Sequence, residues 1–182
     1  MIIDGKIVKL RAIEEDDLEM LRTLINDKNT EYLVGTWNIP ISKAAQRKWF
    51  ENISCDKSSS LHLIIEVEEE GAIGYLTLHN IDWKNRRAMY GMKTKLDRKT
   101  KGVGYDTALT IMKYVFEELQ LNKLECEFIE INESSIYIHE KKCKWHVDGR
   151  RRDEYFQNGR YYDVIIMSIL RNEYYELIKD LN

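Results

Sequence analysis

The segment KTKGVGYDTALTIMKYVFEEL, residues 99–119, joins a basic turn containing two glycines to an amphipathic stretch. Its apolar residues recur at helical spacing, which predicts a helix over 107–119 with Leu109, Met112, Val115 and Phe116 on one face. Glycines let the backbone approach a ligand closely. A helix N-terminus presents unpaired N–H groups and partial positive charge, which attract anions. The turn is either a pyrophosphate cradle or a basic turn that opens a helix.

The two common nucleotide-binding motifs do not match this turn. A Walker loop needs G-x-x-x-x-G-K-[ST], which the segment lacks, and the dinucleotide fingerprint needs a third Gly or Ala where Thr107 stands. No alternating strand–helix pattern surrounds the turn. A nucleotide site of either kind is therefore excluded here.

Composition favours one soluble domain spanning residues 1–182. The chain carries a net charge of −3, one proline and no linker-like run, so there is no bulk electrostatic case for nucleic acid or a membrane surface. The opening residues lack a signal-peptide core, and no stretch reaches the length of a membrane span. Three cysteines without a metal or redox spacing predict free thiols in a reducing cytoplasm.

Periodicity along the chain predicts an α+β (mixed α/β) protein. Helices are expected at 14–27, 43–53, 107–119 and 132–144, with residues 28–41 irregular. Strands are expected at 6–13, 61–68, 72–81, 86–96, 121–131, 147–156 and 160–170. Ser42 and Asn132 are suited to cap the second and fourth helices, and the QNG turn at 157–159 favours a C-terminal hairpin.

The order of strand, K-x-x-G-x-G turn, long helix, strand and Asn132-capped helix resembles the GNAT family of acetyl-CoA-dependent N-acetyltransferases. The segments RRAMYGM (86–92), INESSIYIHEKKCKW (131–145) and VDGRRRDEYFQNGRYYDVIIMSIL (147–170) are similar to the branch with ribosomal-protein alanine and spermidine acetyltransferases. The resemblance implies a central, mostly antiparallel, twisted sheet of about seven strands flanked by about four helices. It also implies acetyl-CoA as cosubstrate, an amine acceptor and a possible homo-oligomer.

Several cofactor contacts follow from the resemblance alone. The turn that would hold the pyrophosphate comprises Lys99, Lys101, Gly102, Val103, Gly104 and Tyr105. Met92, Lys93 and Thr94 would pair with the pantetheine arm as an added strand does. Asn132 and Ser135 would contact the end of that arm, and Lys141 either reaches the 3′-phosphate or is a solvated lysine.

The catalytic positions depart from the family pattern. The frequent tyrosine that protonates the leaving thiolate falls on His139, and the Gly-Phe that follows becomes Lys144-Trp145 with one extra residue. A histidine can serve as the acid, and Tyr137 would take its place if the helix register shifts. His139, Cys143 and His146 are also spaced like metal ligands, but a structural role is favoured and no metal is expected.

The general base and the acceptor are left open by the sequence. A carboxylate found in some relatives is replaced by Met89, which leaves Glu31, His79 and Asp82 as candidate bases. Glu31, Tyr32, Trp37 and Trp83 either bind a cationic amine or pack as ordinary loop residues. The activity is then acetylation of a protein N-terminus or of a small amine such as a polyamine or amino sugar. The alternative is a non-catalytic acetyl-CoA-binding module.

Overall fold

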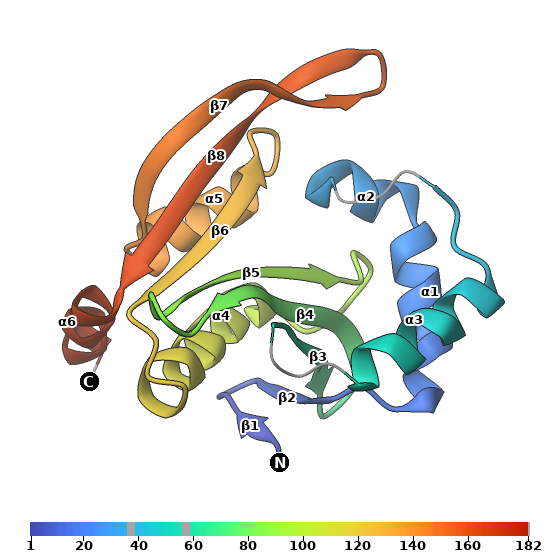
Figure 1. Ribbon diagram of the computed structural model, residues 1–182, viewed down its shortest axis with the longest axis horizontal. Helices are drawn as coiled ribbons and strands as arrows, with labels where there is room; N and C mark the ends of the chain where they lie inside the picture. The colour runs from blue at the N-terminus through green and yellow to red at the C-terminus, as the bar shows by residue number, and fades with distance from the viewer. Residues whose placement is uncertain (36–38, 56–58, 182) are drawn as a thin grey trace.

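A computed structural model describes residues 1–35, 39–55 and 59–181 of the chain, without the side chains of Ser54 and Cys55. Its centre is an eight-stranded sheet with the order β1-β2-β3-β4-β5-β6-β8-β7, in which only the β5–β6 pair is parallel (Figure 1). The strands are β1 (Ile3–Asp4), β2 (Val8–Ala12), β3 (Leu61–Val67), β4 (Gly71–Asp82), β5 (Arg87–Thr94), β6 (Lys123–Ile129), β7 (His146–Gln157) and β8 (Arg160–Leu170).

Six α-helices accompany the sheet in the described part of the chain. They are α1 (Leu18–Asn26), α2 (Lys28–Val34), α3 (Lys43–Cys55), α4 (Val103–Lys113), α5 (Glu133–Tyr137) and α6 (Arg171–Leu181). A 3-10 turn at Glu15–Asp17 precedes α1, and π-type turns at Tyr114–Glu118 and Ile138–Lys142 extend α4 and α5. The predicted mixed, mostly antiparallel fold is confirmed, with one more strand and two more helices than the approximate numbers expected.

One predicted boundary was wrong, and two helices were not predicted. Residues 28–34 form a helix because Asp27 accepts a hydrogen bond from Thr30 N at 2.8 Å and Gly35 ends the helix at φ 65°. The helix expected from residue 107 begins at Val103, directly after Gly102. The final helix, α6, was not predicted; its buried residues are Tyr174 and Leu177, and Tyr174 packs on Phe116 with ring centroids 5.2 Å apart.

The two faces of the sheet bury different helices. Leu76 and Leu78 of β4 join the main core with Ile111 and Met112 of α4. Ile64 of β3 packs on the opposite face in a second cluster with residues of α1 and α3. Alternation along the strands therefore places α4 on one face of the sheet, here called the lower face, and α1 and α3 on the other, the upper face.

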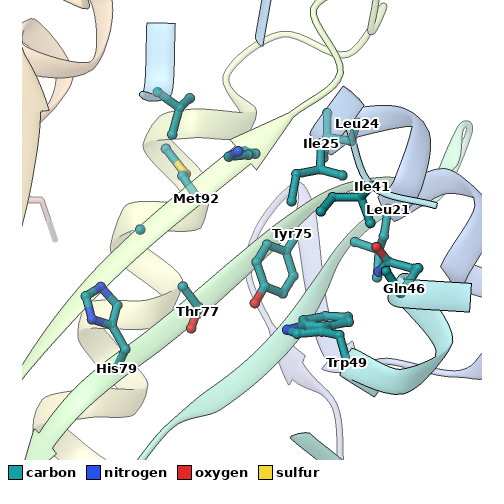
Figure 2. Close-up of a pocket in the computed structure, with 14 residues that line it drawn as sticks. Leu21, Leu24, Ile25, Ile41, Gln46, Trp49, Tyr75, Thr77, His79 and Met92 are labelled. Carbon is teal, nitrogen blue, oxygen red and sulfur yellow. The ribbon is translucent and has the colours of Figure 1, made fainter. Parts of the chain in front are cut away.

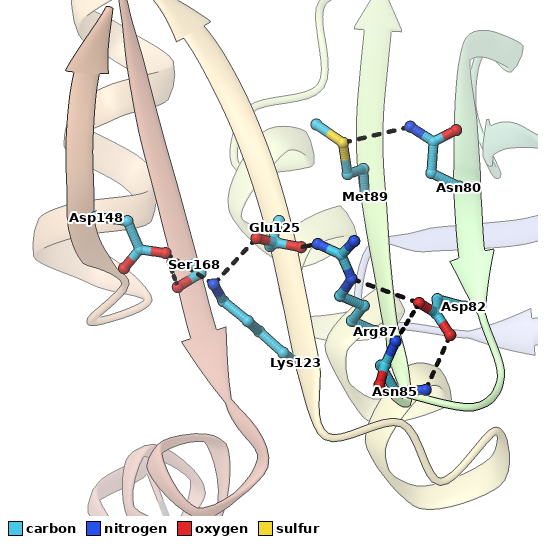
Figure 3. A network of polar contacts seen from close by, with 9 residues as sticks. All are labelled: Asn80, Asp82, Asn85, Arg87, Met89, Lys123, Glu125, Asp148 and Ser168. Atoms are coloured by element: carbon cyan, nitrogen blue, oxygen red, sulfur yellow. Dashed lines mark hydrogen bonds and ion pairs between the residues drawn. The ribbon is translucent and has the colours of Figure 1, made fainter.

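Strands β5 and β6 separate after a short parallel contact. Their pairing runs from Arg87–Lys123 to Met89–Glu125 and no further. A polar network holds this closed end: Arg87 pairs with Asp82 and Glu125, and Lys123 pairs with Glu125 and Asp148 (Figure 3). Beyond Met89 the two strands diverge and leave the inner edge of β5 facing a gap.

The structure can be compared with the predictions made for the cysteines and for membrane-spanning segments. Cys126 and Cys143 are free and buried, while the side chain of Cys55 lies outside the described residues. None of the described helices is long and apolar enough to cross a membrane.

Candidate active site

The gap between β5 and β6 forms a narrow crevice of about 50 Å³. The N–H of Lys95 donates to Ile73 O of β4, so strand alternation turns the N–H groups of Met92 and Thr94 towards the gap. The crevice wall includes Tyr90 and Met92 from β5 and Phe128 from β6, with His139 at its base. An extended chain could therefore add to the β5 edge, as the sequence comparison of Met92, Lys93 and Thr94 predicted.

The N-terminus of α4 lies at the open end of this edge. Gly102 precedes the helix at φ 80°, a conformation that favours glycine, and no side chain caps the first turn. A Cβ at Gly104 would meet Ile138 Cδ1 at 3.3 Å and Met92 Cε at 3.6 Å. The backbone N–H groups of the first turn of α4 are therefore not capped by a side chain among the described residues. Lys99 and Lys101 are exposed beside it.

Two carboxylates fix the position of this turn. Asp106, which is buried, accepts hydrogen bonds from the backbone N–H groups of Lys6, Ile7 and Val8 at 2.7 to 3.2 Å. Glu70 accepts from the Thr100 hydroxyl at 2.5 Å and from the N–H groups of Lys99 and Thr100 at 2.9 and 2.7 Å. These bonds lower the pKa of Glu70 to about 2. Asp106 therefore has a structural role, and neither carboxylate was identified from the sequence.

His139 lies at the base of the crevice in a defined protonation state. Its Nδ1 is 2.7 Å from the carbonyl oxygen of Ser135, which can only accept, so Nδ1 carries the proton. Nε2 is then the acceptor for the hydroxyl of Tyr90. The side chain is fully buried against Phe128 and Trp145, and burial lowers its pKa to about 4. At neutral pH this imidazole is uncharged.

The extra residue near the end of this helix is accommodated by the π-type turn. Cys143 N donates to Ile138 O at 2.9 Å, which is one residue longer than the α-helical spacing. Lys144 then adopts φ 59°, and Trp145 is buried with its Nε1 donating to Met112 Sδ at 3.2 Å. Lys144 and Trp145 thus stand where the family pattern has Gly and Phe, and His139 stays inside the protein.

The other residues predicted for the cofactor and the catalytic step lie partly in the crevice and partly on the surface. Asn132 and Ser135 line the crevice, and Asn132 also accepts from Ser135 N at 3.3 Å and donates to Leu33 O at 3.2 Å. The structure does not bring Tyr137 there: it is 55% exposed on the outer face of α5. Lys141 is exposed and pairs with Glu140 at 2.7 Å. Among the described residues, no group of three or more His, Cys, Asp or Glu side chains could hold a metal ion.

Of the predicted acceptor residues, Glu31 and Tyr32 line one cavity of about 610 Å³ that the turn between β7 and β8 also borders, whereas Trp83 does not line it. Trp83 is half-exposed in the turn between β4 and β5, next to Asp82 at the closed end of the sheet. The hydroxyl of Tyr32 lies 3.4 Å from that of Tyr162 on β8. Glu31 is buried and forms an ion pair with Lys93 of β5. Trp37 lies outside the described residues.

A cavity of about 460 Å³ occupies the upper face of the sheet, between β4, β5 and helices α1 to α3. Its helical and loop side is lined by apolar side chains: Leu21, Leu24, Ile25, Val34, Ile41 and Trp49. Tyr75, Thr77 and His79 form a row along β4 on the sheet side (Figure 2). Burial lowers the pKa of His79, so its imidazole is neutral at pH 7 and able to accept a proton.

The cavity and the crevice meet at β5. Both are lined by Val34, Gly91 and Met92, which places them on either side of the same short stretch of backbone. A group held in the crevice and a second molecule in the cavity would come together there. The sequence pattern gave no sign of this cavity, because its walls come from segments that are far apart in the chain.

Comparison with known proteins agrees with this geometry. Residues 8–142 match the model of the acetyltransferase (GNAT) domain family. The spermidine N(1)-acetyltransferase of Vibrio cholerae serotype O1 is 25% identical over 166 residues, 91% of this chain and 94% of that protein. The spermidine N(1)-acetyltransferase of Escherichia coli K12 is 28% identical over 167 residues, 92% of this chain and 88% of that protein.

A solved structure gives the same answer for the fold. The crystal structure of the Vibrio cholerae spermidine N-acetyltransferase in complex with CoA and spermine has a TM-score of 0.83 at 24% identity, over 92% of this chain and 98% of that one. The chain belongs to the acetyltransferase (GNAT) domain family. It is an acetyl-CoA-dependent N-acetyltransferase.

Proposed function

We propose that acetyl-CoA binds in the gap between β5 and β6 and that its acetyl group passes to an amine held in the cavity above Gly91 and Met92. The observation that carries this proposal is that crevice and cavity share the wall formed by Val34, Gly91 and Met92. The pantetheine arm would pair with the β5 edge, and the pyrophosphate would bind the N–H groups at the start of α4.

The reaction needs a neutral amine, an oxyanion donor and a proton for the leaving thiolate. In this proposal His79 takes the proton from the amine, since its neutral imidazole lines the cavity. Of the other candidate bases, Glu31 is engaged by Lys93 and Asp82 lies at the closed end of the sheet. The N–H of Met92, directed towards the gap, would stabilise the tetrahedral oxyanion.

The thiolate would receive its proton from the Tyr90–His139 pair in the crevice. Because His139 accepts at Nε2 and is neutral, the proton that this pair can release is that of the Tyr90 hydroxyl, which would turn from Nε2 to the thiolate. Burial raises the pKa of Tyr90, so the tyrosinate that remains would take up a proton from solvent as the thiol leaves. His139 thus keeps the proton-handling role predicted from its position but acts by positioning Tyr90. Tyr137 has no part in this arrangement.

The role of His79 predicts a particular pH profile. His79→Gln should lower kcat/KM by about a hundredfold or more, because the amide cannot take the proton. In the wild type, kcat/KM should also fall as the pH drops below the lowered pKa of His79, and this limb should disappear in the variant. Steady-state rates from pH 5 to 9 measure both effects. A variant that keeps the limb and the wild-type rate would exclude His79 as the base.

The binding site can be tested with a matched pair of substitutions at Gly102. Asn and Asp both tolerate the positive φ of 80° at this position, and only Asp adds negative charge beside the proposed pyrophosphate. Calorimetry should show acetyl-CoA affinity at least about tenfold weaker in Gly102→Asp than in Gly102→Asn, a difference of ~1.4 kcal/mol. Equal affinity in the two variants would place the phosphates elsewhere.

A further inference from the structure

We propose that the acceptor is a monoamine with an apolar, uncharged body, aromatic or aliphatic, and not a polyamine. This inference rests on the proposed function, since it assigns the cavity above β5 to the acceptor. The inference is drawn from the side chains that line the cavity, because their polarity and charge determine which class of amine can bind there.

The wall opposite the sheet is mostly hydrocarbon, and Gln46 of α3 is the polar side chain among its described residues. Leu21, Leu24 and Ile25 come from α1, Ile41 from the segment before α3, and Trp49 from α3 itself (Figure 2). The volume of about 460 Å³ lies in the range of sites that enclose small organic ligands. Water in such a site has few polar partners, so an apolar chain that displaces it gains affinity.

Two of the polar side chains in the cavity, Lys93 and Tyr75, have partners within the protein. Lys93 is the single charged side chain among its described lining residues, and Glu31 neutralises it in a buried ion pair. The hydroxyl of Tyr75 lies 2.5 Å from His62 Nδ1, and His79 is neutral. No carboxylate among the described residues lines this cavity. A second ammonium group on the acceptor would be buried there without a partner, at a cost of several kcal/mol.

The lining of the cavity favours a different acceptor from the one that the names of the relatives give. Two of the similar proteins are named spermidine acetyltransferases, and the solved relative was crystallised with spermine. A polyamine carries several positive charges along a flexible chain. The cavity described here offers such a chain uncharged polar side chains and a mostly hydrocarbon wall, with no carboxylate among the described lining residues.

A homologous series of amines tests the proposal on the intact protein. From propylamine to hexylamine, kcat/KM should rise about fourfold with each methylene, the rate equivalent of ~0.8 kcal/mol per buried CH₂. Adding a second ammonium to the terminal carbon of hexylamine, as in 1,6-diaminohexane, should lower kcat/KM by at least about a hundredfold. Phenethylamine should be acetylated at a rate near that of hexylamine, and spermidine should be a poor acceptor.

Two substitutions at Gln46, a buried residue of α3 in the cavity wall, provide the matched control. Gln46→Glu places a carboxylate in the cavity. It should raise kcat/KM at least about tenfold for one or more diamines of the series, because the carboxylate pairs with the second ammonium and offsets the cost of burying it. Gln46→Met has similar length without charge and should keep the preference for alkylamines. Thermal unfolding of both variants establishes that they are folded.

The possible outcomes distinguish an error in the acceptor class from an error in the proposed function. Turnover of spermidine or diaminohexane in preference to hexylamine would overturn the acceptor class and leave acetyl transfer in place. Absence of any shift towards diamines in folded Gln46→Glu would show that the acceptor binds outside the cavity, which overturns the inference. No thiol release from acetyl-CoA with any amine would overturn the proposed function itself.

Discussion

At the scale of single residues, the state of His139 decides how the crevice works. Its imidazole is inside the protein, donates to a helix carbonyl and accepts from Tyr90. A histidine with pKa about 4 is a poor acid by itself at pH 7, because almost none of it is protonated. We therefore interpret His139 as one half of a pair in which the phenol of Tyr90 supplies the proton.

Substitution at 139 should affect the rate more than cofactor binding. His139→Phe removes the acceptor that orients Tyr90 and should lower kcat by about a hundredfold or more, with little change in the calorimetric affinity for acetyl-CoA. His139→Tyr should recover much of the rate, since a phenol at this position can donate directly. Tyr90→Phe should match His139→Phe, and the double variant should lose no more, as expected for groups that act as a unit.

Tyr137→Phe is the control for this series, and its kcat should stay near wild type because the side chain is exposed. A folded His139→Phe protein with near-native kcat would remove the pair from the mechanism. A parallel loss of acetyl-CoA affinity and thermal stability would indicate a purely structural role for His139.

Some residue-level features could be predicted and others could not. The glycines at 102 and 104 were identified from their spacing, because a basic G-x-G turn before an apolar stripe is a local pattern. The role of Asp106 was not, because its partners are backbone amides about 100 positions away in sequence. The protonation state of His139 depends on burial, which no short sequence window records.

At the scale of elements, α2 is fixed to the sheet by a buried ion pair. Glu31 and Lys93 have side chains only 7% and 10% exposed, and they join α2 to the strand that would hold the cofactor. Asn132 adds a second link from α5 to the end of α2 through Leu33 O. The helix that closes one side of the cavity is thus tied to both walls of the crevice.

Breaking this pair from one side should be costly. Lys93→Met leaves Glu31 buried without its counter-charge and should lower the free energy of unfolding by about 3–5 kcal/mol. The double variant Glu31→Gln/Lys93→Met removes both charges and should recover most of that loss. Urea unfolding of the two single variants and the double variant gives the coupling energy. Equal losses in Lys93→Met and in the double variant would contradict a buried, mutually compensating pair.

Two of the elements that sequence reasoning missed, α2 and β1, share a physical cause, whereas α6 was missed although Tyr174 and Leu177 stand at helical spacing. α2 is only seven residues long, and its capping residues Asp27 and Gly35 are its clearest signals, since it lacks a repeated apolar face. β1 has two residues and depends on its pairing with β2. Longer strands and helices with regular apolar periodicity were placed within a few residues, because tertiary packing reinforced the local preference.

At the scale of the whole molecule, the divergence of β5 and β6 generates both halves of the site. The network around Arg87 and Lys123 holds the strands together at one end, and the chain supplies no pairing beyond Met89. The unpaired edge of β5 borders the crevice, and the cavity borders the same stretch of β5. The family resemblance predicted a strand edge open to pantetheine, whereas the apolar character of the cavity required the folded structure.

Burial of neutral histidines should make the whole fold sensitive to mild acid. The pKa of His139 falls from an ordinary 6.5 to about 4 on folding. Below pH 6.5 the unfolded chain therefore binds a proton that the folded chain does not. The part of the free energy of unfolding that depends on His139 is fully present above pH 6.5 and is lost as the pH falls towards 4. It amounts to about 3 kcal/mol in total, of which about 2 kcal/mol is lost by pH 5. Burial lowers the pKa of His62 and of His79 as well, which acts in the same direction.

Urea unfolding at pH 7.5, 6 and 5 measures this loss. The wild type should become steadily less stable over that range, and His139→Phe, although less stable at pH 7.5, should lose about 2 kcal/mol less between pH 7.5 and 5. An identical slope in His139→Phe and the wild type would mean that His139 accepts a proton in the folded protein as readily as in the unfolded chain, contrary to its burial between Tyr90, Phe128 and Trp145.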